Sequence, residues 1–228
     1  MTNHRQGQSP LNPLEIKEWL DDLRNILFDL NICLDNVKRL SMLKYEQEEW
    51  VKGHGFFDLY MHQLRFIIVI QLSKLIADNK RTHKRNFFHL CEKLELMDLN
   101  GDFLKELRKY QPDSRFELES TQQSIDVLTE NVKEKLNRHR FQIESIVKAR
   151  DQIYAHNDPN SNKKVPVIRD LEIMILLCNE VFNGFTGELF KSHTEFSRTT
   201  GWDIDFILKE MSARRKLKLE ERPLRGNV

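Results

Sequence analysis

Proline and glycine are scarce in this sequence. Only six prolines and eight glycines occur in 228 residues, and no proline stands between Leu14 and Gln111. An all-β chain needs many tight turns, and those turns are rich in these two residue types. The scarcity therefore argues against an all-β fold and favours long helices.

A strong net charge is also missing. The chain has 36 basic and 35 acidic residues, with a formal net charge of +1. No overall electrostatic field is therefore expected to attract nucleic acid or an anionic membrane. Any site for a polyanion must be local.

Cysteine pairs, metal-ligand spacings and nucleotide-binding loops are absent as well. Cys33, Cys91 and Cys178 are far apart and form no CxxC pair, which predicts buried, reduced thiols in a reducing compartment. The histidines near them lack the paired spacing of a zinc site. No GxGxxG, P-loop or GxSxG motif occurs. We expect no metal and no cofactor.

Neither a signal peptide nor a membrane-spanning segment is expected. The first residues, MTNHRQGQSPLNP, have no apolar core, so no signal peptide is expected. The most apolar run, LRFIIVIQLSKLIA at 64–77, is interrupted by Arg65 and Lys74, which predicts a core helix. We expect a cytoplasmic protein without membrane partners.

Apolar residues recur at steps of three and four over most of the chain. The first such segment begins at Pro13, with Asn12 as its expected N-cap. GHG at 53–55 and NGD at 100–102 mark turns, and 103–120 has a less regular pattern. The further helices are expected at about 56–78, 86–97, 121–156, 167–191 and 202–217.

Together these segments predict an all-α bundle of five to seven helices. We expect a flexible N-terminus at 1–12, a single helical domain at 13–217, and a flexible C-terminal tail at 218–228.

Arg150 interrupts an apolar stripe. With residues 132–154 projected onto one helix at about 100° per residue, Arg150 falls near the middle of that stripe. His139 shares this face. A buried guanidinium is costly unless it meets an anion, a carbonyl cluster or a wet cleft. A salt bridge or a snorkelling side chain at a helix contact is the alternative. The stripe consists of Val132, Leu136, Ile143, Ile146, Val147, Ile153 and Tyr154.

His156 is expected at the end of this helix, because Asn157 and the Asp158–Pro159 pair do not continue a regular helix. In a regular helix it would point roughly 120° away from Arg150. An unwound last turn would bring the two side chains together. The alternative is an imidazolium that caps the helix C-terminus.

The run ARDQIYAHND at 149–158 resembles the Arg-x(4–6)-His motif of HEPN domains, and most closely that of the abortive-infection branch. QLSKLIAD at 71–78 is similar to a less distinctive part of that family, and the resemblance extends over about 14–195. It implies a metal-independent endoribonuclease, often a toxin in phage defence or in a toxin–antitoxin pair. It also implies a homodimer with both motifs at one cleft.

The resemblance assigns the catalytic positions to Arg150 and His156. In RNA cleavage the 2′-hydroxyl attacks the adjacent phosphate, so a base, an acid and a cation suffice. One motif histidine per chain makes a symmetric dimer the mechanistic expectation. Asp151 would orient a ring or an arginine across the dimer, Asn157 would hold the loop or donate to RNA, and Tyr154 would stack on a base or pack in the core.

Two other functions remain open. One is a non-catalytic scaffold for RNA, nucleotide or protein, and the other is a plain helical interaction protein with Arg150 in a structural salt bridge. An antitoxin or regulatory protein is a possible partner. Some HEPN toxins are modified on a tyrosine shortly after the histidine, in a His-x-Tyr sequence. This chain has Asn157–Asp158 after His156, which disfavours that regulatory variant. The basic segments KRTHKRN (80–86) and RRKLK (214–218) would contact RNA or simply be solvated.

Overall fold

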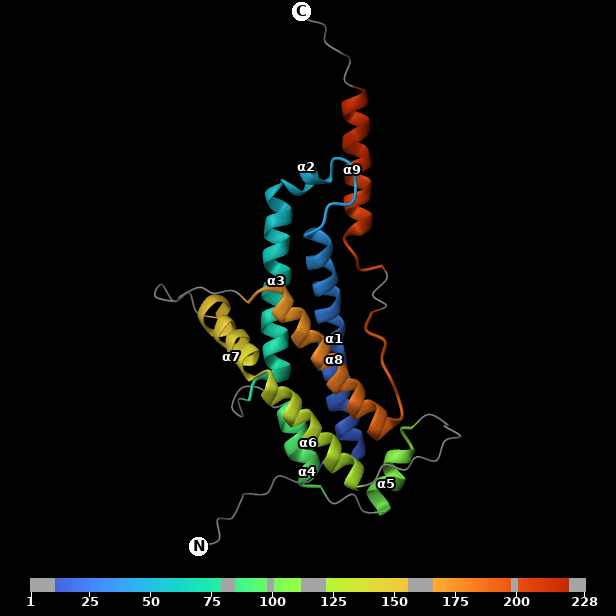
Figure 1. Cartoon of the computed structure of the whole chain (residues 1–228). Helices are drawn as coiled ribbons and strands as arrows, with labels where there is room; N and C mark the ends of the chain where they lie inside the picture. The colour runs from blue at the N-terminus through green and yellow to red at the C-terminus, as the bar shows by residue number, and fades with distance from the viewer. Residues whose placement is uncertain are drawn as a thin grey trace, which may run out of the picture.

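The computed structural model describes residues 11–78, 85–97, 101–111, 122–155, 166–197 and 201–221, with the backbone alone at 153–155. This part of the chain contains nine α-helices, one π-helical segment and no strand (Figure 1). The predicted all-α class is confirmed. The elements are α1 (Pro13–Leu40), α2 (Glu48–Lys52), α3 (Gly55–Ile76), α4 (Phe87–Glu95), α5 (Gly101–Arg108), α6 (Gln122–Arg138), α7 (Arg140–Ala149), η1 (Arg150–Ala155), α8 (Ile168–Phe190) and α9 (Asp205–Glu220).

The helices outnumber the expected five to seven for two reasons. Helices α2 and α5 are short, with five and eight residues, so their apolar periodicity covers too few turns to be visible in the sequence. The segment expected as one helix at 121–156 is also divided. The long helices lie close to their predicted positions.

Local sequence determines the start of α1. The side chain of Asn12 accepts a hydrogen bond from the backbone N–H of Glu15 at 2.9 Å, and Glu15 accepts one from the backbone N–H of Asn12 at 2.8 Å. This reciprocal pair is a capping box, and Pro13 occupies the first helical position. The predicted N-cap is confirmed.

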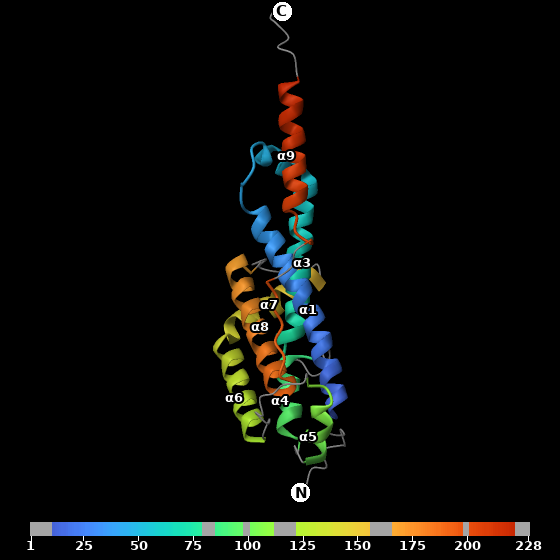
Figure 2. The ribbon, with the colours of Figure 1, turned by 90° about the vertical axis from the view of Figure 1, so that its right-hand side faces the viewer.

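The bundle is built on two antiparallel helices, α1 and α3, which pack along their length (Figure 1). Helix α8 crosses this pair, and α6 packs on α8 and α4. Helix α7 and η1 leave the bundle axis and pack against α3 (Figures 1 and 2). This places the residues around 150 on one side of the α1–α3 pair.

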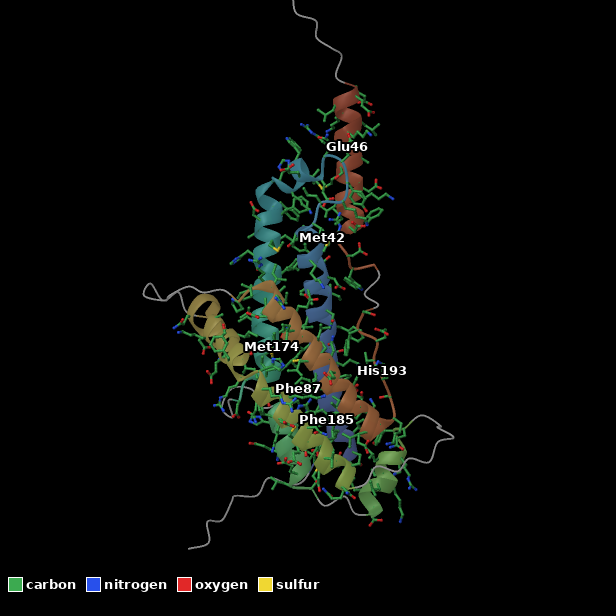
Figure 3. The ribbon with its side chains drawn as sticks, viewed as in Figure 1. Met42, Glu46, Phe87, Met174, Phe185 and His193 are labelled. Carbon is green, nitrogen blue, oxygen red and sulfur yellow. The ribbon has the colours of Figure 1, made fainter. Side chains whose placement is uncertain are left out.

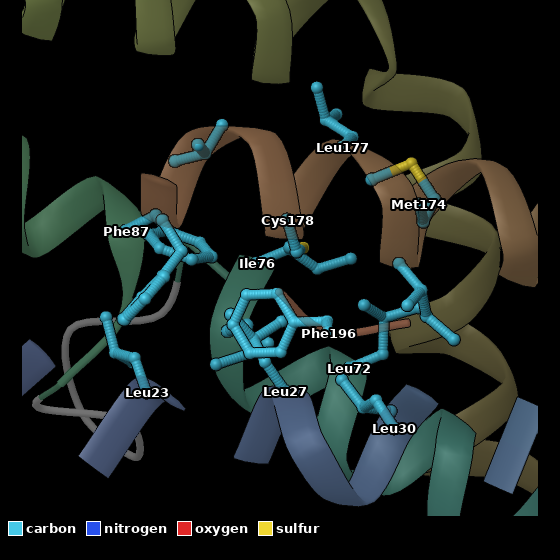
Figure 4. Close-up of a cluster of buried hydrophobic side chains, with 14 of the residues drawn as sticks. Leu23, Leu27, Leu30, Leu72, Ile76, Phe87, Met174, Leu177, Cys178 and Phe196 are labelled. Carbon is cyan, nitrogen blue, oxygen red and sulfur yellow. The ribbon is translucent and has the colours of Figure 1, made fainter. Parts of the chain in front are cut away.

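The core lies where α1, α3, α4 and α8 meet (Figure 4). Phe87 of α4 stacks on Phe185 of α8 with ring centroids 6.4 Å apart. The buried side chains at the centre include Leu23, Leu27 and Leu30 of α1, Leu72 and Ile76 of α3, and Cys178 of α8. As predicted, the apolar run at 64–77 supplies a core helix.

Among the described residues, α8 is the one helix whose length and composition would suit a membrane span. In this fold, however, 56% of its apolar window is buried within the protein. It packs against α1, α3, α5 and α6. These helix contacts account for its apolar composition.

The expectation of one regular helix over 132–154 is wrong. Helix α6 ends at Arg138, and His139 has φ −101° and ψ 20°, outside the helical region. No glycine or proline stands there, so the bend follows from packing: α6 packs on α4 and α8, whereas α7 turns towards α3.

Helix α9 projects beyond the bundle at the end opposite α5 (Figure 2). It extends to Glu220, three residues past the predicted limit of 217. Its base is tied to α1 through Asn36, which donates to the carbonyl of Trp202 at 3.0 Å and accepts from the backbone N–H of Ile204 at 2.8 Å. Further up, Lys216 pairs with Glu46 at 2.9 Å (Figure 3).

Candidate functional site around Arg150

Arg150 lies where α7 ends and η1 begins. Its side chain is 14% exposed, and both Nε and Nη2 lie 2.7 Å from Oδ1 of Asp151. The Asp151 side chain is 51% exposed. The cation predicted on the apolar face is thus half-buried rather than fully buried, and the exposed carboxylate of Asp151 compensates part of its charge.

The backbone from Arg150 to Ala155 is π-helical. A π-turn bonds each N–H to the carbonyl five residues back, so it holds one residue more than an α-turn and shifts the following side chains around the axis. π-helical turns are rare in proteins, but those that occur often lie at functional sites. The regular projection of 100° per residue therefore fails from Arg150 onwards.

The other predicted site residues are only partly described. His156 and Asn157 lie outside the described residues, and Tyr154 is described by its backbone alone. The structure thus brings Arg150 and Asp151 together, while the relation of Arg150 to His156 remains a prediction from sequence.

Within its own chain Asp151 pairs with Arg150. The expected role of Asp151 in orienting a ring or an arginine across a dimer stays a prediction. Adjacent residues on a regular helix point in directions about 100° apart. The pair forms where the α-helix gives way to the π-helix.

A pocket of about 530 Å³ lies beside this pair, among α3, α4, α6, α7 and η1. Its apolar floor combines fully buried with half-buried side chains. The floor is formed by Ala77 after α3, Phe88 of α4, Leu136 of α6, and Ile143 and Val147 of α7.

The rim of the pocket is polar and mostly exposed. Arg140, Glu144 and Lys148 line it from successive turns of α7, and Arg140 pairs with Glu144 at 3.0 Å. The remaining rim residues are Asp78, Asn137, Asp151 and Gln152. Asp151 thus belongs both to the pocket and to the ion pair with Arg150.

This pocket was not predicted from the sequence. Its α7 face carries a visible signal, since residues at i, i+4 and i+8 share one face of a helix. Asp78 and Phe88, however, come from segments far away in sequence. Only the tertiary structure brings these parts together.

The two basic segments differ in what the structure describes. In 80–86, Arg85 pairs with Asp22, and Asn86 caps α4 by accepting from the N–H of His89 at 2.8 Å; residues 80–84 lie outside the described part. In 214–218, Arg215 stacks over Trp50 at 3.6 Å. Arg85 and Arg215 thus each have a partner within the chain.

The metal and thiol predictions can be compared with the described residues. Within these ranges no group of three or more His, Cys, Asp or Glu side chains lies close enough to hold a metal ion. Cys33, Cys91 and Cys178 are free and buried, which confirms the predicted buried thiols. Burial raises the pKa of Cys91 to about 12. These thiols are therefore poor nucleophiles in the folded protein.

Comparisons with known proteins add no family to this description, because no family model, curated protein or solved structure matches the chain.

Proposed function

We propose that this protein is a metal-independent endoribonuclease of the HEPN type, acting as a toxin in phage defence or in a toxin–antitoxin pair. The observation that carries the proposal is the guanidinium of Arg150, 14% exposed at the first residue of a π-helical turn and six residues before His156. Such a permanent cation is suited to binding a phosphate through two hydrogen bonds.

The reaction needs few groups from the protein. The 2′-oxygen of the ribose attacks phosphorus, its proton passes to a base, and the bond from phosphorus to the 5′-oxygen breaks as that oxygen receives a proton from an acid. The products are a 2′,3′-cyclic phosphate and a 5′-hydroxyl. Arg150 stabilises the charge on the pentavalent phosphate.

His156 transfers the protons in this proposal. An unperturbed imidazole has a pKa of about 6.5 and can act as base or acid near neutral pH. The reaction needs both roles, and the motif supplies one histidine per chain. The active form is therefore a symmetric homodimer in which one protomer and its partner each contribute Arg150 and His156.

The ion pair with Asp151 orients Arg150 in this scheme. The carboxylate holds Nε and Nη2 at 2.7 Å, which restricts the rotation of a long side chain. Asp151 is then a positioning residue. Tyr154 and Asn157 are proposed to contact RNA or hold the loop.

The test is cleavage of end-labelled RNA by the purified protein with EDTA present. We expect cleavage by wild type, with a 2′,3′-cyclic phosphate at the new end, and its loss in Arg150→Ala and in His156→Ala. Matched controls are Arg24→Ala, which removes another arginine paired to a nearby acid, and His193→Ala, an exposed histidine on the segment after α8 (Figure 3). Equal cleavage by wild type and both motif variants would refute the proposal.

One observation favours a second function, a non-catalytic scaffold that binds RNA or protein. Arg150 already has a carboxylate partner within its own chain, as a structural salt bridge would require. Asp151→Asn separates the two functions. A ribonuclease would lose cleavage rate on RNA while its fold persists, whereas a scaffold would show no cleavage in either form and a lower melting temperature.

A further inference from the structure

We propose that the pocket beside Arg150 binds one nucleotide of the RNA chain, with its base on the apolar floor and its phosphate at Lys148. This inference rests on the proposed ribonuclease function and names the part of the substrate that the site selects. The pocket of about 530 Å³ lies within the range of about 300–1,000 Å³ that is typical of ligand sites.

The floor suits a flat aromatic ring. Phe88 of α4 and Val147 of α7 are half-buried, and both line the pocket. A base that stacks on an aromatic side chain is stabilised without regard to its identity, because every base has a π-face. The polar rim would keep the ribose and phosphate in water.

The charges on the rim indicate where phosphate and base would lie. Arg140 is paired with Glu144, whereas Lys148 and Asp78 form no ion pair with any described residue. Lys148 is therefore the cation available to a phosphate. Asp78 offers a carboxylate, which can only accept hydrogen bonds.

An acceptor on the rim gives the pocket a base preference. Adenine, cytosine and guanine carry an exocyclic amino group that donates to a carboxylate, whereas the only donor on the pairing edge of uracil is N3–H, which lies between two carbonyl oxygens that a carboxylate repels. The amides of Asn137 and Gln152 can donate and accept, so they do not oppose this choice. We therefore expect bases with an amino group to bind more tightly than uracil.

Asp151 connects this pocket to the catalytic arginine. Its side chain lines the pocket, and its Oδ1 holds Arg150. A nucleotide in the pocket thus lies on one side of that carboxylate and the guanidinium on the other. The chain of an RNA seated there continues towards Arg150, where the scissile phosphate would bind.

The experiment measures binding without cleavage, with fluorescein-labelled 2′-O-methyl oligonucleotides that lack the attacking hydroxyl. Anisotropy titrations compare oligo-C and oligo-A with oligo-U. We expect Val147→Trp, which fills the pocket, and Lys148→Glu to weaken oligo-C binding about tenfold or more, equivalent to about 1.4 kcal/mol.

Matched controls are Val127→Trp, an exposed valine of α6 outside the pocket, and Lys105→Glu on α5. Both should bind as wild type does. Circular dichroism checks the fold of each variant, and Lys148→Glu, at an exposed position, serves if Val147→Trp does not fold. Unchanged binding by folded pocket variants, or equal binding of oligo-U and oligo-C, overturns the proposal.

Free nucleotides form a separate arm. CMP that binds as tightly as oligo-C would assign the pocket to free nucleotides and overturn the RNA assignment.

The outcomes also separate this inference from the ribonuclease proposal. RNA cleavage that is lost in Arg150→Ala but unaffected by pocket variants refutes the pocket alone, whereas pocket-dependent binding without any RNA cleavage refutes the ribonuclease alone.

Discussion

Arg39 donates to both carboxylate oxygens of Glu48, from Nη1 to Oε1 at 2.7 Å and from Nη2 to Oε2 at 3.0 Å. Glu48 is fully buried, and the Arg39 side chain is 13% exposed. Nε of Arg39 also bonds to Asp205 at the start of α9. One guanidinium thus joins α1, α2 and α9, so we expect this end of the bundle to unfold together.

Removing the buried charge of Glu48 should destabilise the fold strongly. Glu48→Gln leaves Arg39 and Lys52 without their shared carboxylate, and breaking a buried pair costs about 3–5 kcal/mol. Urea unfolding gives this free energy. The control is Glu134→Gln, whose pair with Arg138 is more than half exposed and should change stability by less than about 1 kcal/mol. Similar losses in both variants would contradict the assigned role of Glu48.

The same carboxylate should make stability fall in acid. Burial by itself raises the pKa of Glu48, but hydrogen bonds from Arg39 and Lys52 and from the N–H groups of Lys44 and Tyr45 outweigh it and lower the pKa from 4.5 to about 2. The pKa of Asp205 is also lowered: burial raises it, and hydrogen bonds from Lys44, Tyr45 and Arg39 reverse that effect.

A pKa that is lower in the folded protein adds stability above the unfolded value, and this stability is lost as the pH falls through the folded value. We therefore expect the unfolding free energy to decline from pH 4.5 down to about 2. Glu48→Gln should flatten this decline. Urea midpoints measured across the window provide the test, and equal slopes in wild type and variant would disprove it.

Asn36 should control how firmly α9 is attached. This side chain is 2% exposed and bonds to the backbone of Trp202 and Ile204. Asn36→Ala leaves a buried N–H and a carbonyl unsatisfied, at a cost of about 1–3 kcal/mol. Hydrogen exchange should quicken in α9 more than in α3. Asn25→Ala, at an exposed position of α1, should leave both unchanged.

The three thiols should react slowly in the native protein. Burial, aided by the charge of Asp29, raises the pKa of Cys33 to about 11, and burial raises the pKa of Cys91 to about 12 and that of Cys178 further. Since the thiolate is the reactive form, a disulfide reagent at about pH 8 should label all three only after unfolding. Rapid labelling of folded protein would contradict their burial.

Much of this fold could be predicted from sequence because its long helices have long apolar stripes. The start of α1 at Pro13 and the apolar run that forms α3 follow from local patterns of three to five turns. The half-buried position of Arg150 followed from the same kind of pattern, since its neighbours on α7 are apolar. Short helices such as α2 lack that length.

The sequence by itself determined the helical class, the long helices and a cation within an apolar stripe, because each depends on spacing along one segment. Only the tertiary structure decided the bend at His139, the π-helical turn from Arg150 and the pairing of Arg150 with Asp151. It also decided the pocket, because Asp78 and Phe88 meet Lys148 only once α3, α4 and α7 have packed. Packing between distant segments sets the bend and the pocket, and no local pattern of residues encodes that packing.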